Sequence, residues 1–246
     1  MSQWQLGFCD RAIATIDEAI AHGRHGSHAN SMAYALCWGG IALEYFLGNL
    51  EMVEQHAREL ADLSDRHGMA MWQAYAHAAL GWRGARAGEA ATGVALIEKG
   101  LAELELTGTA YWRPFMLLLL AEAHLVDGAI DNALTVLEEA LAASVRRQEL
   151  LLEPELHRRR GDVLLKGTAR VVEARACLET ALDIARRRRT RSWELRAACD
   201  LARVLAEQGK RGEAHDLVAS AYSQFTEGFD TADLKGAKAL LDELGA

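Results

Sequence analysis

Hydrophobic and polar residues alternate along this 246-residue chain with the period of an α-helix. Apolar side chains recur three and four positions apart, as at Leu134, Leu137 and Leu141, which places them on one face of a helix. Segments of this kind follow one another along nearly the whole chain, and short glycine-containing stretches separate many of them. The pattern predicts a protein that is helical almost everywhere.

Small side chains recur in triplets, in which the second residue lies twelve positions after the first and the third seven positions further. The copies, one with an inserted residue and one degenerate, are Gly81, Gly93 and Gly100; Ala121, Ala133 and Ala140; Ala202, Ala214 and Ala221; Gly161, Ala174 and Ala181; and Ile41, Val53 and Leu60. Ala12 and Ala19 match the end of an earlier, truncated copy. The last places, 19, 60, 100, 140, 181 and 221, give a period of about 40 residues, which an ordinary helical bundle does not require.

The triplets have a physical reason, because two antiparallel helices approach closely only where their side chains are short. Glycine also lies five positions before the middle residue of four copies, where it ends a first helix cheaply in the left-handed conformation. These glycines are Gly48, Gly88, Gly128 and Gly209. One helix pair cannot cover its own apolar face, so neighbouring pairs must stack.

The predicted fold is an all-α, right-handed superhelical solenoid of antiparallel helix pairs with a C-terminal capping helix. First helices are expected near 27–47, 69–87, 110–127, 153–166 and 191–208, and second helices near 10–22, 50–67, 89–106, 130–147, 170–188 and 211–226. We expect a single domain over 1–246, with a truncated first repeat at 1–22, repeats at about 27–67, 69–106, 110–147, 153–188 and 191–226, and a cap at 231–244.

Charge and hydropathy exclude several classes of protein. Lys and Arg total 27 against 35 Asp and Glu, a net charge of −8, so we expect no nucleic-acid binding by this chain alone. The longest strongly apolar run, 115–121, is too short to span a bilayer, and charged residues interrupt the first twenty positions. We therefore expect a cytoplasmic protein that binds no membrane.

The residues that most often bind metals or carry out catalysis form no recognisable motif. The four cysteines have no CxxC pair and are predicted to be small core residues; they are Cys9, Cys37, Cys177 and Cys199. His22, His25 and His28 have a spacing that could hold a metal on a helix, but Gly23 and Gly26 predict a loop there. With no GxxxxGK[ST] phosphate loop either, we expect no metal, no cofactor and no enzymatic activity.

The small-residue triplet resembles the tetratricopeptide repeat, although that family's repeat is typically about 34 residues long. HEAT-type repeats match the longer period better, but not the spacing of the small residues. Longer helices would absorb the additional residues of each copy.

The C-terminal half is similar to the tetratricopeptide-like C-terminal region of large bacterial signal-transduction ATPases. The similar stretches are YWRPFMLLLLAEAHLVDGAIDNALTVLEEAL (111–141), ELHRRRGDVLL (155–165), EARACLETALDIARR (173–187), SWELRAACDLARVLAEQGKRGEAHDLV (192–218) and FTEGFDTADLKGAKALLDEL (225–244). Such proteins often join a class III adenylate or guanylate cyclase domain, or a DNA-binding domain, to an ATPase. The resemblance implies a sensor or partner-binding role and carries no catalytic residue to this chain.

The chain begins within a repeat, since the first helix of the earliest copy would need residues before Met1. It also has no room for a cyclase domain. We therefore expect a fragment of a larger protein or a shortened relative, with a protein or peptide partner or other domains of its own parent chain as the binding partner.

First helices line the concave face of a stacked array, and helical phase selects the residues that face it. The candidate partner- or ligand-binding residues are Trp38, Tyr45, Phe46, Tyr75, Trp82, Arg86, Phe115 and Glu122 in the N-terminal half, and Glu155, Arg158, Arg159, Asp162, Arg196, Asp200 and Arg203 in the C-terminal half. Aromatic rings and arginine forks suit a peptide with an apolar end and an acidic end. Alternatively, the aromatic residues fill the core and the charged residues form a solvated lattice.

The sequence thus predicts a non-catalytic interaction and regulatory scaffold, the C-terminal sensor region of a multidomain bacterial ATPase, cyclase or transcriptional regulator. The alternative is a small-molecule receptor that holds an effector in the groove between Trp38, Trp82 and Arg158. An enzyme would need a buried carboxylate or histidine pair in a cleft, and nothing in the spacing indicates one.

Overall fold

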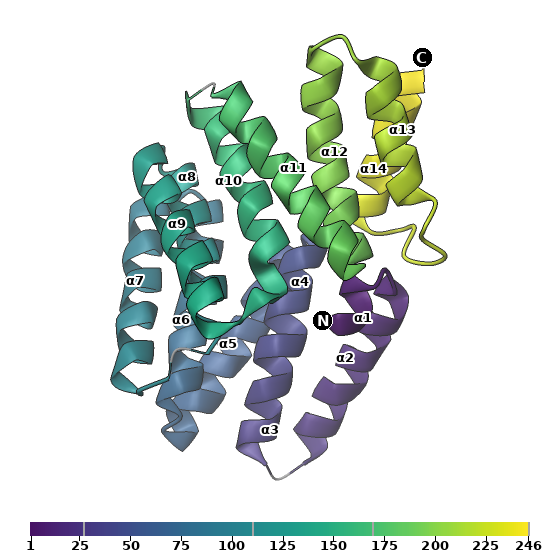
Figure 1. The fold of residues 1–246 in the computed structure, drawn as a ribbon. Coiled ribbons are helices and arrows are strands. Elements are labelled where there is room, and N and C mark those ends of the chain that lie inside the picture. The colour runs from purple at the N-terminus through teal and green to yellow at the C-terminus, as the bar shows by residue number, and fades with distance from the viewer. Residues whose placement is uncertain (27, 110, 169, 246) are drawn as a thin grey trace. The chain divides into compact units, whose positions relative to one another are not determined.

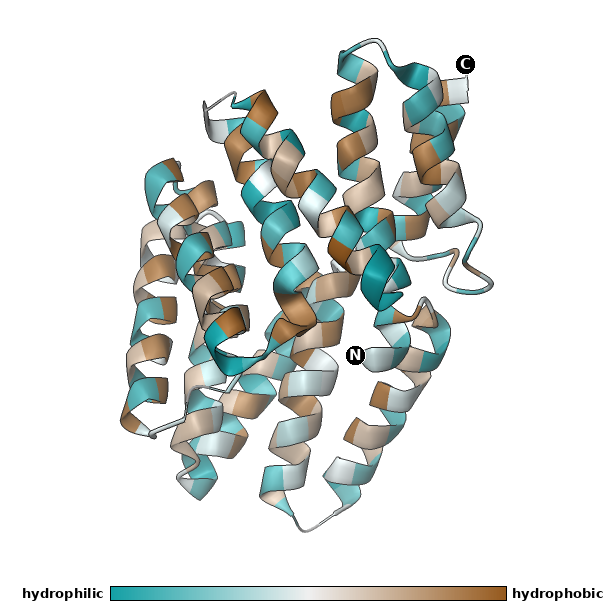
Figure 2. Cartoon of the chain, in the orientation of Figure 1, coloured by the Kyte–Doolittle hydropathy of each residue, from teal (hydrophilic) through white to brown (hydrophobic). Residues whose placement is uncertain are grey.

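The computed structural model describes residues 1–26, 28–109, 111–168 and 170–245, and every regular element in these ranges is a helix (Figure 1). The helices are α1 (Ser2–Gln5), α2 (Cys9–His25), α3 (Ala29–Tyr34), the π-helix η1 (Ala35–Ile41), α4 (Ala42–Leu47), α5 (Leu50–His67), α6 (Ala70–Arg86), α7 (Ala90–Leu106), α8 (Arg113–Val126), α9 (Ile130–Arg147), the 3-10 helix η2 (Leu150–Leu152), α10 (Glu153–Thr168), α11 (Val171–Arg188), α12 (Arg191–Glu207), α13 (Arg211–Tyr222) and α14 (Ala232–Gly245). Hydrophobic and hydrophilic bands alternate along them in Figure 2, as the sequence pattern predicts.

The helices form two compact units. The N-terminal unit contains Met1 and Ile13–Glu149, and the C-terminal unit contains Ser2–Ala12 together with the chain from Leu150 onward. Helix α2 begins in the C-terminal unit and continues in the N-terminal unit. The assignment of residues 1–246 to one repeat domain stays a prediction.

Antiparallel pairs build the N-terminal unit, and the small-residue triplets lie where the paired helices meet. A Cβ atom added to Gly81 on α6 would lie 2.6 Å from the carbonyl oxygen of Gly93 on α7. One added to Gly100 would lie 2.6 Å from the carbonyl oxygen of Ala74. The backbones therefore approach more closely than any side chain allows, which is the physical reason for the triplet.

The C-terminal unit repeats this arrangement with α10 against α11 and α12 against α13. Its core consists of Leu, Ala and Val side chains from α11, α12 and α13, and α14 covers one end of it. Leu234, Ala237, Leu240 and Leu244 of α14 are buried there, three or four positions apart. The predicted capping helix at 231–244 is confirmed as Ala232–Gly245.

Glycine ends the first helices as predicted. The backbone φ angles are positive at the four predicted positions: 78° at Gly48, 100° at Gly88, 77° at Gly128 and 80° at Gly209. The helices are also long, with 17 or 18 residues each in α5, α6, α7, α9, α11 and α12. Their length accommodates a period of about 40 residues.

The loop predicted at Gly23 was wrong, whereas the predicted helix 27–47 is present as α3, η1 and α4. Helix α2 runs to His25 rather than ending at 22, so Gly23 lies inside the helix and packs against Met32. A Cβ atom on Gly23 would lie 2.6 Å from the Met32 sulfur. The predicted helix 27–47 also contains a π-helix, in which Gly39 and Gly40 make room for Ile16 and His56. Ser27, in the predicted loop, and Ala110, at the start of a predicted helix, lie outside the described residues.

Three further expectations concern the cysteines, membrane crossing and metal binding. All four cysteines are buried, as predicted for core residues. In the described ranges, no helix combines the length and apolar character that crossing a membrane requires. Those ranges likewise contain no group of three or more His, Cys, Asp or Glu side chains placed to hold a metal ion.

Candidate functional site

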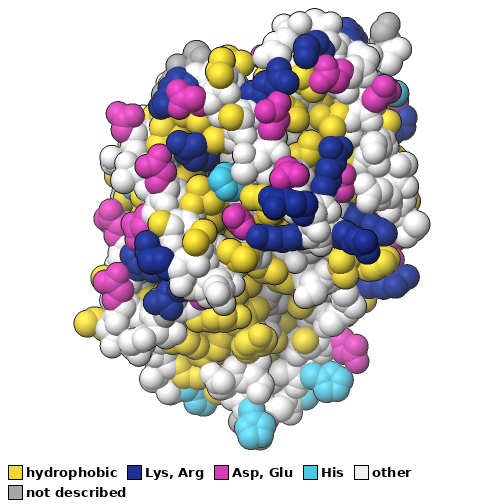
Figure 3. All heavy atoms as spheres, viewed as in Figure 1, with side chains coloured by type: hydrophobic (Ala, Val, Ile, Leu, Met, Phe, Trp, Pro, Cys, Tyr) yellow, Lys and Arg dark blue, Asp and Glu magenta, His cyan; other side chains and the backbone are white. Residues whose placement is uncertain are grey.

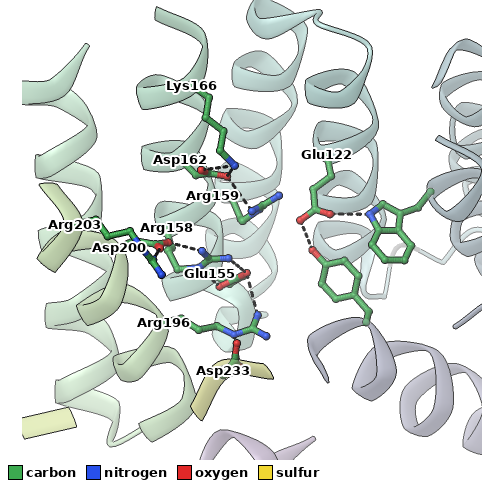
Figure 4. A network of polar contacts seen from close by, with 12 residues as sticks. Glu122, Glu155, Arg158, Arg159, Asp162, Lys166, Arg196, Asp200, Arg203 and Asp233 are labelled. Atoms are coloured by element: carbon green, nitrogen blue, oxygen red, sulfur yellow. Dashed lines mark hydrogen bonds and ion pairs between the residues drawn. The ribbon is translucent and has the colours of Figure 1, made fainter. Parts of the chain in front are cut away.

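A buried ion pair lies within the C-terminal unit (Figure 4). Glu155 on α10 accepts two hydrogen bonds from Arg158, one turn further along: 2.7 Å from Nε and 2.6 Å from Nη2. The Glu155 side chain is only 1% exposed. Burial by itself raises the pKa of Glu155, but the charges of Arg158 and Arg196 outweigh burial and hold that pKa below its usual value. Glu155 is therefore an anion that fixes the orientation of Arg158.

Arg158 connects this pair to α12. Its Nη1 lies 2.5 Å from Oδ2 of Asp200, whose other oxygen accepts a 2.8 Å hydrogen bond from Arg203. The Arg203 side chain is 53% exposed, whereas Arg158 is 14% exposed. The network therefore runs from a buried carboxylate to a guanidinium at the surface.

Arg196 connects the same carboxylate to α14. Its Nη1 lies 3.4 Å from Oε1 of Glu155, and its Nε donates a 2.7 Å hydrogen bond to Asp233. Three helices thus meet through one set of charges, since α10, α12 and α14 each supply a residue. Asp233 was not predicted, because nothing in its spacing links it to residues 37 positions away.

A second branch lies further along α10. Asp162 accepts a 3.0 Å hydrogen bond from Arg159 and pairs with Lys166 at 2.9 Å. The spacing of Asp162 and Lys166, four positions apart on a helix, is a signal that the sequence does carry. Lys166 is 62% exposed and therefore presents its ammonium group to solvent.

A pocket of about 300 Å³ lies between these two branches. Its lining residues, from α10, α11 and α12, are Asp162, Leu165, Lys166, Val171, Leu178, Asp200, Arg203, Val204 and Glu207. Apolar side chains make up one part of the lining and charged side chains of both signs the other. Figure 3 shows Lys and Arg side chains close to acidic ones over the helices of this unit.

In the N-terminal unit, Glu122 joins two of the predicted aromatic residues. It accepts a 2.6 Å hydrogen bond from the Tyr45 hydroxyl and a 2.7 Å hydrogen bond from the Trp82 indole nitrogen. Phe115 packs on Tyr45, with ring centroids 5.4 Å apart, and also on Phe46. The structure therefore brings these five residues together, as helical phase predicts, in a buried cluster.

Trp38 is the centre of a second aromatic cluster in this unit. Five rings have centroids within 6.2 Å of the Trp38 ring; they belong to Tyr34, Trp72, Tyr75, Tyr111 and Trp112. Only Tyr75 of these was predicted. Trp72 lies three positions before Tyr75 and shares its helix face, so the spacing could have indicated it, whereas Tyr111 and Trp112 precede α8 and have no helical phase.

The two halves of the predicted site differ in exposure. The predicted aromatic residues and Glu122 are all buried, and Arg86 is exposed. The predicted charged residues form two branches of ion pairs, in which Arg203 is the exposed member. Arg86 and Arg203 are therefore the predicted residues most exposed to solvent.

The sequence and the fold were also compared with known proteins. Residues 152–227, which include α10 to α13, match the tetratricopeptide repeat family. The crystal structure of BtubC (BKLC) from P. vanneervenii covers 90% of each chain at 15% identity, with a TM-score of 0.59. That of a putative kinesin light chain with TPR-like repeats from P. anserina covers 74% of this chain and 90% of its own at 18% identity, with a TM-score of 0.53. The fold is a tetratricopeptide-like helical repeat.

Among curated proteins, this tetratricopeptide-like chain is 25% identical over 185 residues to an uncharacterized protein of Rhizobium meliloti (strain 1021). The match takes in 75% of this chain but only 18% of that protein. The chain therefore spans less than a fifth of the length of the curated relative it matches. The pocket lies inside the stretch that matches the repeat family, as do the residues of the ion-pair network except Asp233.

Proposed function

We propose that this chain is a non-catalytic scaffold that binds a segment of a protein partner through the α10–α12 pocket of the C-terminal unit. One observation carries the proposal. The pocket is lined partly by apolar side chains, the exposed cations Lys166 and Arg203 lie at its rim, and the buried Glu155–Arg158 ion pair holds its α12 side in place. Glu155 fixes Arg158, Arg158 fixes Asp200, and Asp200 in turn orients Arg203. A rim held in this way loses little side-chain entropy when a partner binds.

The chemistry of the lining defines the segment that would fit. Val171, which is 37% exposed, and the half-buried Leu165 offer apolar contact for one aliphatic or aromatic side chain. Lys166 and Arg203 reach solvent beside them and can donate hydrogen bonds to carboxylates. We therefore propose a partner segment with an apolar anchor next to acidic residues, which agrees with the peptide expected from the sequence.

The wider context is also a proposal. Similarity of the C-terminal stretches to the repeat region of bacterial signal-transduction ATPases supports a sensor role in a multidomain ATPase, cyclase or transcriptional regulator. The much greater length of the Rhizobium meliloti relative agrees with a repeat region that works beside other domains. On this proposal the partner is a catalytic or DNA-binding domain of the same pathway or the same polypeptide.

A small-molecule receptor is less well supported. Trp38 and Trp82, which such a receptor would need in the groove, are 7% and 3% exposed. Their rings contact other aromatic rings of the N-terminal unit. Side chains packed in this way contribute to a core.

The test compares two double variants as baits in an extract of the source cells. K166Q/R203Q removes both rim charges and keeps the side-chain stems. The control K210Q/K238Q removes two exposed charges outside the pocket lining, one just before α13 and one on α14. We expect the first variant to capture about tenfold less partner than the parent, and the control to capture as much as the parent. Mass spectrometry should identify proteins with ATPase, cyclase or DNA-binding domains. Equal capture by both variants would contradict the pocket as the binding site.

A further inference from the structure

The segment Ser2–Ala12, here called the N-terminal latch, packs against the rest of the C-terminal unit. Trp4 packs edge-to-face against Trp193 of α12, with ring centroids 4.6 Å apart, and both side chains are 1% exposed. The Arg196 guanidinium lies over both rings, 5.2 Å from the Trp4 centroid and 5.7 Å from that of Trp193. The Ser192 hydroxyl donates a hydrogen bond to the Trp4 carbonyl. Trp4 is therefore an aromatic anchor with both stacking and polar contacts.

The rest of the latch follows the same unit. Gly7 has a φ of 89°, and a Cβ atom there would lie 3.2 Å from the Phe225 ring, so a side chain at this position would be strained. Further along, Asp10 accepts a 3.1 Å hydrogen bond from the backbone N–H of Gly228. Trp4, Gly7 and Asp10 are thus spaced three positions apart. Besides them, Arg11 pairs with Glu227 at 3.2 Å, and Cys9 packs against Gly228.

The surface under the latch, here called the latch surface, comprises Ser192, Trp193, Arg196, Phe225 and Gly228. Interactions that do not involve the latch hold its key cation, because Arg196 also pairs with Asp233 at 2.7 Å and with Glu155 at 3.4 Å. A guanidinium fixed from behind keeps its orientation when the segment above it leaves. The surface is therefore preorganised for an exchangeable ligand.

We propose that the latch is an intramolecular ligand, and that the latch surface binds a partner segment of the pattern Trp-x-x-Gly-x-x-Asp in its place. This inference goes beyond the proposed function, because it concerns a surface distinct from the α10–α12 pocket. The latch competes with the partner segment, and its covalent attachment gives it a high effective concentration. Removal of its anchor therefore favours binding of the partner.

Cys9 supplies a reporter of latch opening. It is a buried part of the latch, and its Cβ atom lies 2.7 Å from where a Cβ on Gly228 would be. Burial raises the pKa of the Cys9 thiol to about 11, so it reacts slowly with alkylating reagents while the latch is closed. Cys37, Cys177 and Cys199 are buried elsewhere and serve as internal references for the rest of the fold.

The experiment adds a synthetic peptide of residues 1–12, carrying C9S, to the full wild-type chain. We expect a saturable rise of about tenfold in the rate of Cys9 alkylation, with no change at the three reference cysteines, because the peptide displaces the latch. The same peptide with W4A should have no effect. A Cys9 rate that stays constant at all peptide concentrations would overturn the proposal.

Two variants of the full chain extend the test. W4A should raise the Cys9 rate about tenfold and bind the peptide more tightly than wild type, whereas L6A, which changes a 44% exposed side chain of the same segment, should behave as wild type. If W4A exposes all four cysteines, the variant has unfolded and the titration of the wild-type chain decides. Dimers that form on opening would identify a second copy as the occupant and overturn the proposal of a partner segment. K166Q/R203Q should leave peptide binding unchanged, which separates this inference from the proposed function.

Discussion

At the scale of single residues, arginines of similar sequence context differ in what they do. Arg158 and Arg203 both lie on first helices, yet Arg158 compensates a buried carboxylate and Arg203 lies at the surface. Removal of Arg158 leaves Glu155 as an uncompensated buried charge, which is among the most destabilising changes in a protein. Removal of Arg203 breaks an exposed ion pair, which contributes little.

We expect R158A to lower the free energy of unfolding by about 3–5 kcal/mol and R203A by less than about 1 kcal/mol. Urea denaturation at neutral pH measures both. Because the folded-state pKa of Glu155 lies below the ordinary 4.5, the stability that its charge provides is present above that pH and is lost as the pH falls through the depressed value. The difference between wild type and R158A should therefore shrink in acid. Equal losses in the two variants would contradict the buried pair.

The sequence indicates one half of this network. The spacing of Glu155 and Arg158, three positions apart on a helix, is visible without a structure. Asp200 lies 42 positions from Arg158, and only the stacking of α12 beside α10 brings them together. Helical phase could not pair the charges, because pairing depends on how two helices are aligned.

At the scale of helices, two glycines of α6 differ in their packing. Gly81 lies in the middle of α6, where the carbonyl of Gly93 excludes a side chain, and Gly84 lies one turn later with no atom within 4 Å of its missing Cβ. The two positions share a helix but differ in packing. They form a matched pair for testing the close helix approach.

G81A should destabilise the protein by about 1–3 kcal/mol, since a methyl group there forces α6 and α7 apart. G84A should stabilise it by about 0.5–1 kcal/mol, since alanine favours a helix more than glycine does. Thermal denaturation of both variants, followed by circular dichroism, measures the difference. A G81A variant that melts at or above the temperature of the parent would contradict the packing role of the triplet.

The helices themselves were largely predictable, because the triplets fix the period and the glycines with positive φ mark the turns. The prediction failed at Gly23, where glycine packs closely inside a helix rather than forming a turn, as Gly39 and Gly40 also do. A sequence shows that a glycine is present but not which of the two purposes it serves. In the π-helix Ala35–Ile41, Gly39 and Gly40 serve close packing.

At the scale of the whole molecule, the segment Ser2–Ala12 belongs to the C-terminal unit. The pattern placed residues 1–22 in a truncated repeat of their own, because periodicity reports only contacts between neighbouring repeats. The hydrogen bond from Ser192 to Trp4 spans 188 positions and leaves no periodic signal. The packing of the latch could therefore not be predicted from the sequence pattern.

Site-specific photo-cross-linking tests most directly whether the α10–α12 pocket holds a partner segment. A photoreactive residue would replace Glu207 in the pocket lining, and in a second variant Glu213 on α13, outside that lining. Irradiation of cells that express each variant should join the partner to position 207 and not to position 213. Cross-links of equal yield at both positions, or at position 213 alone, would contradict the account.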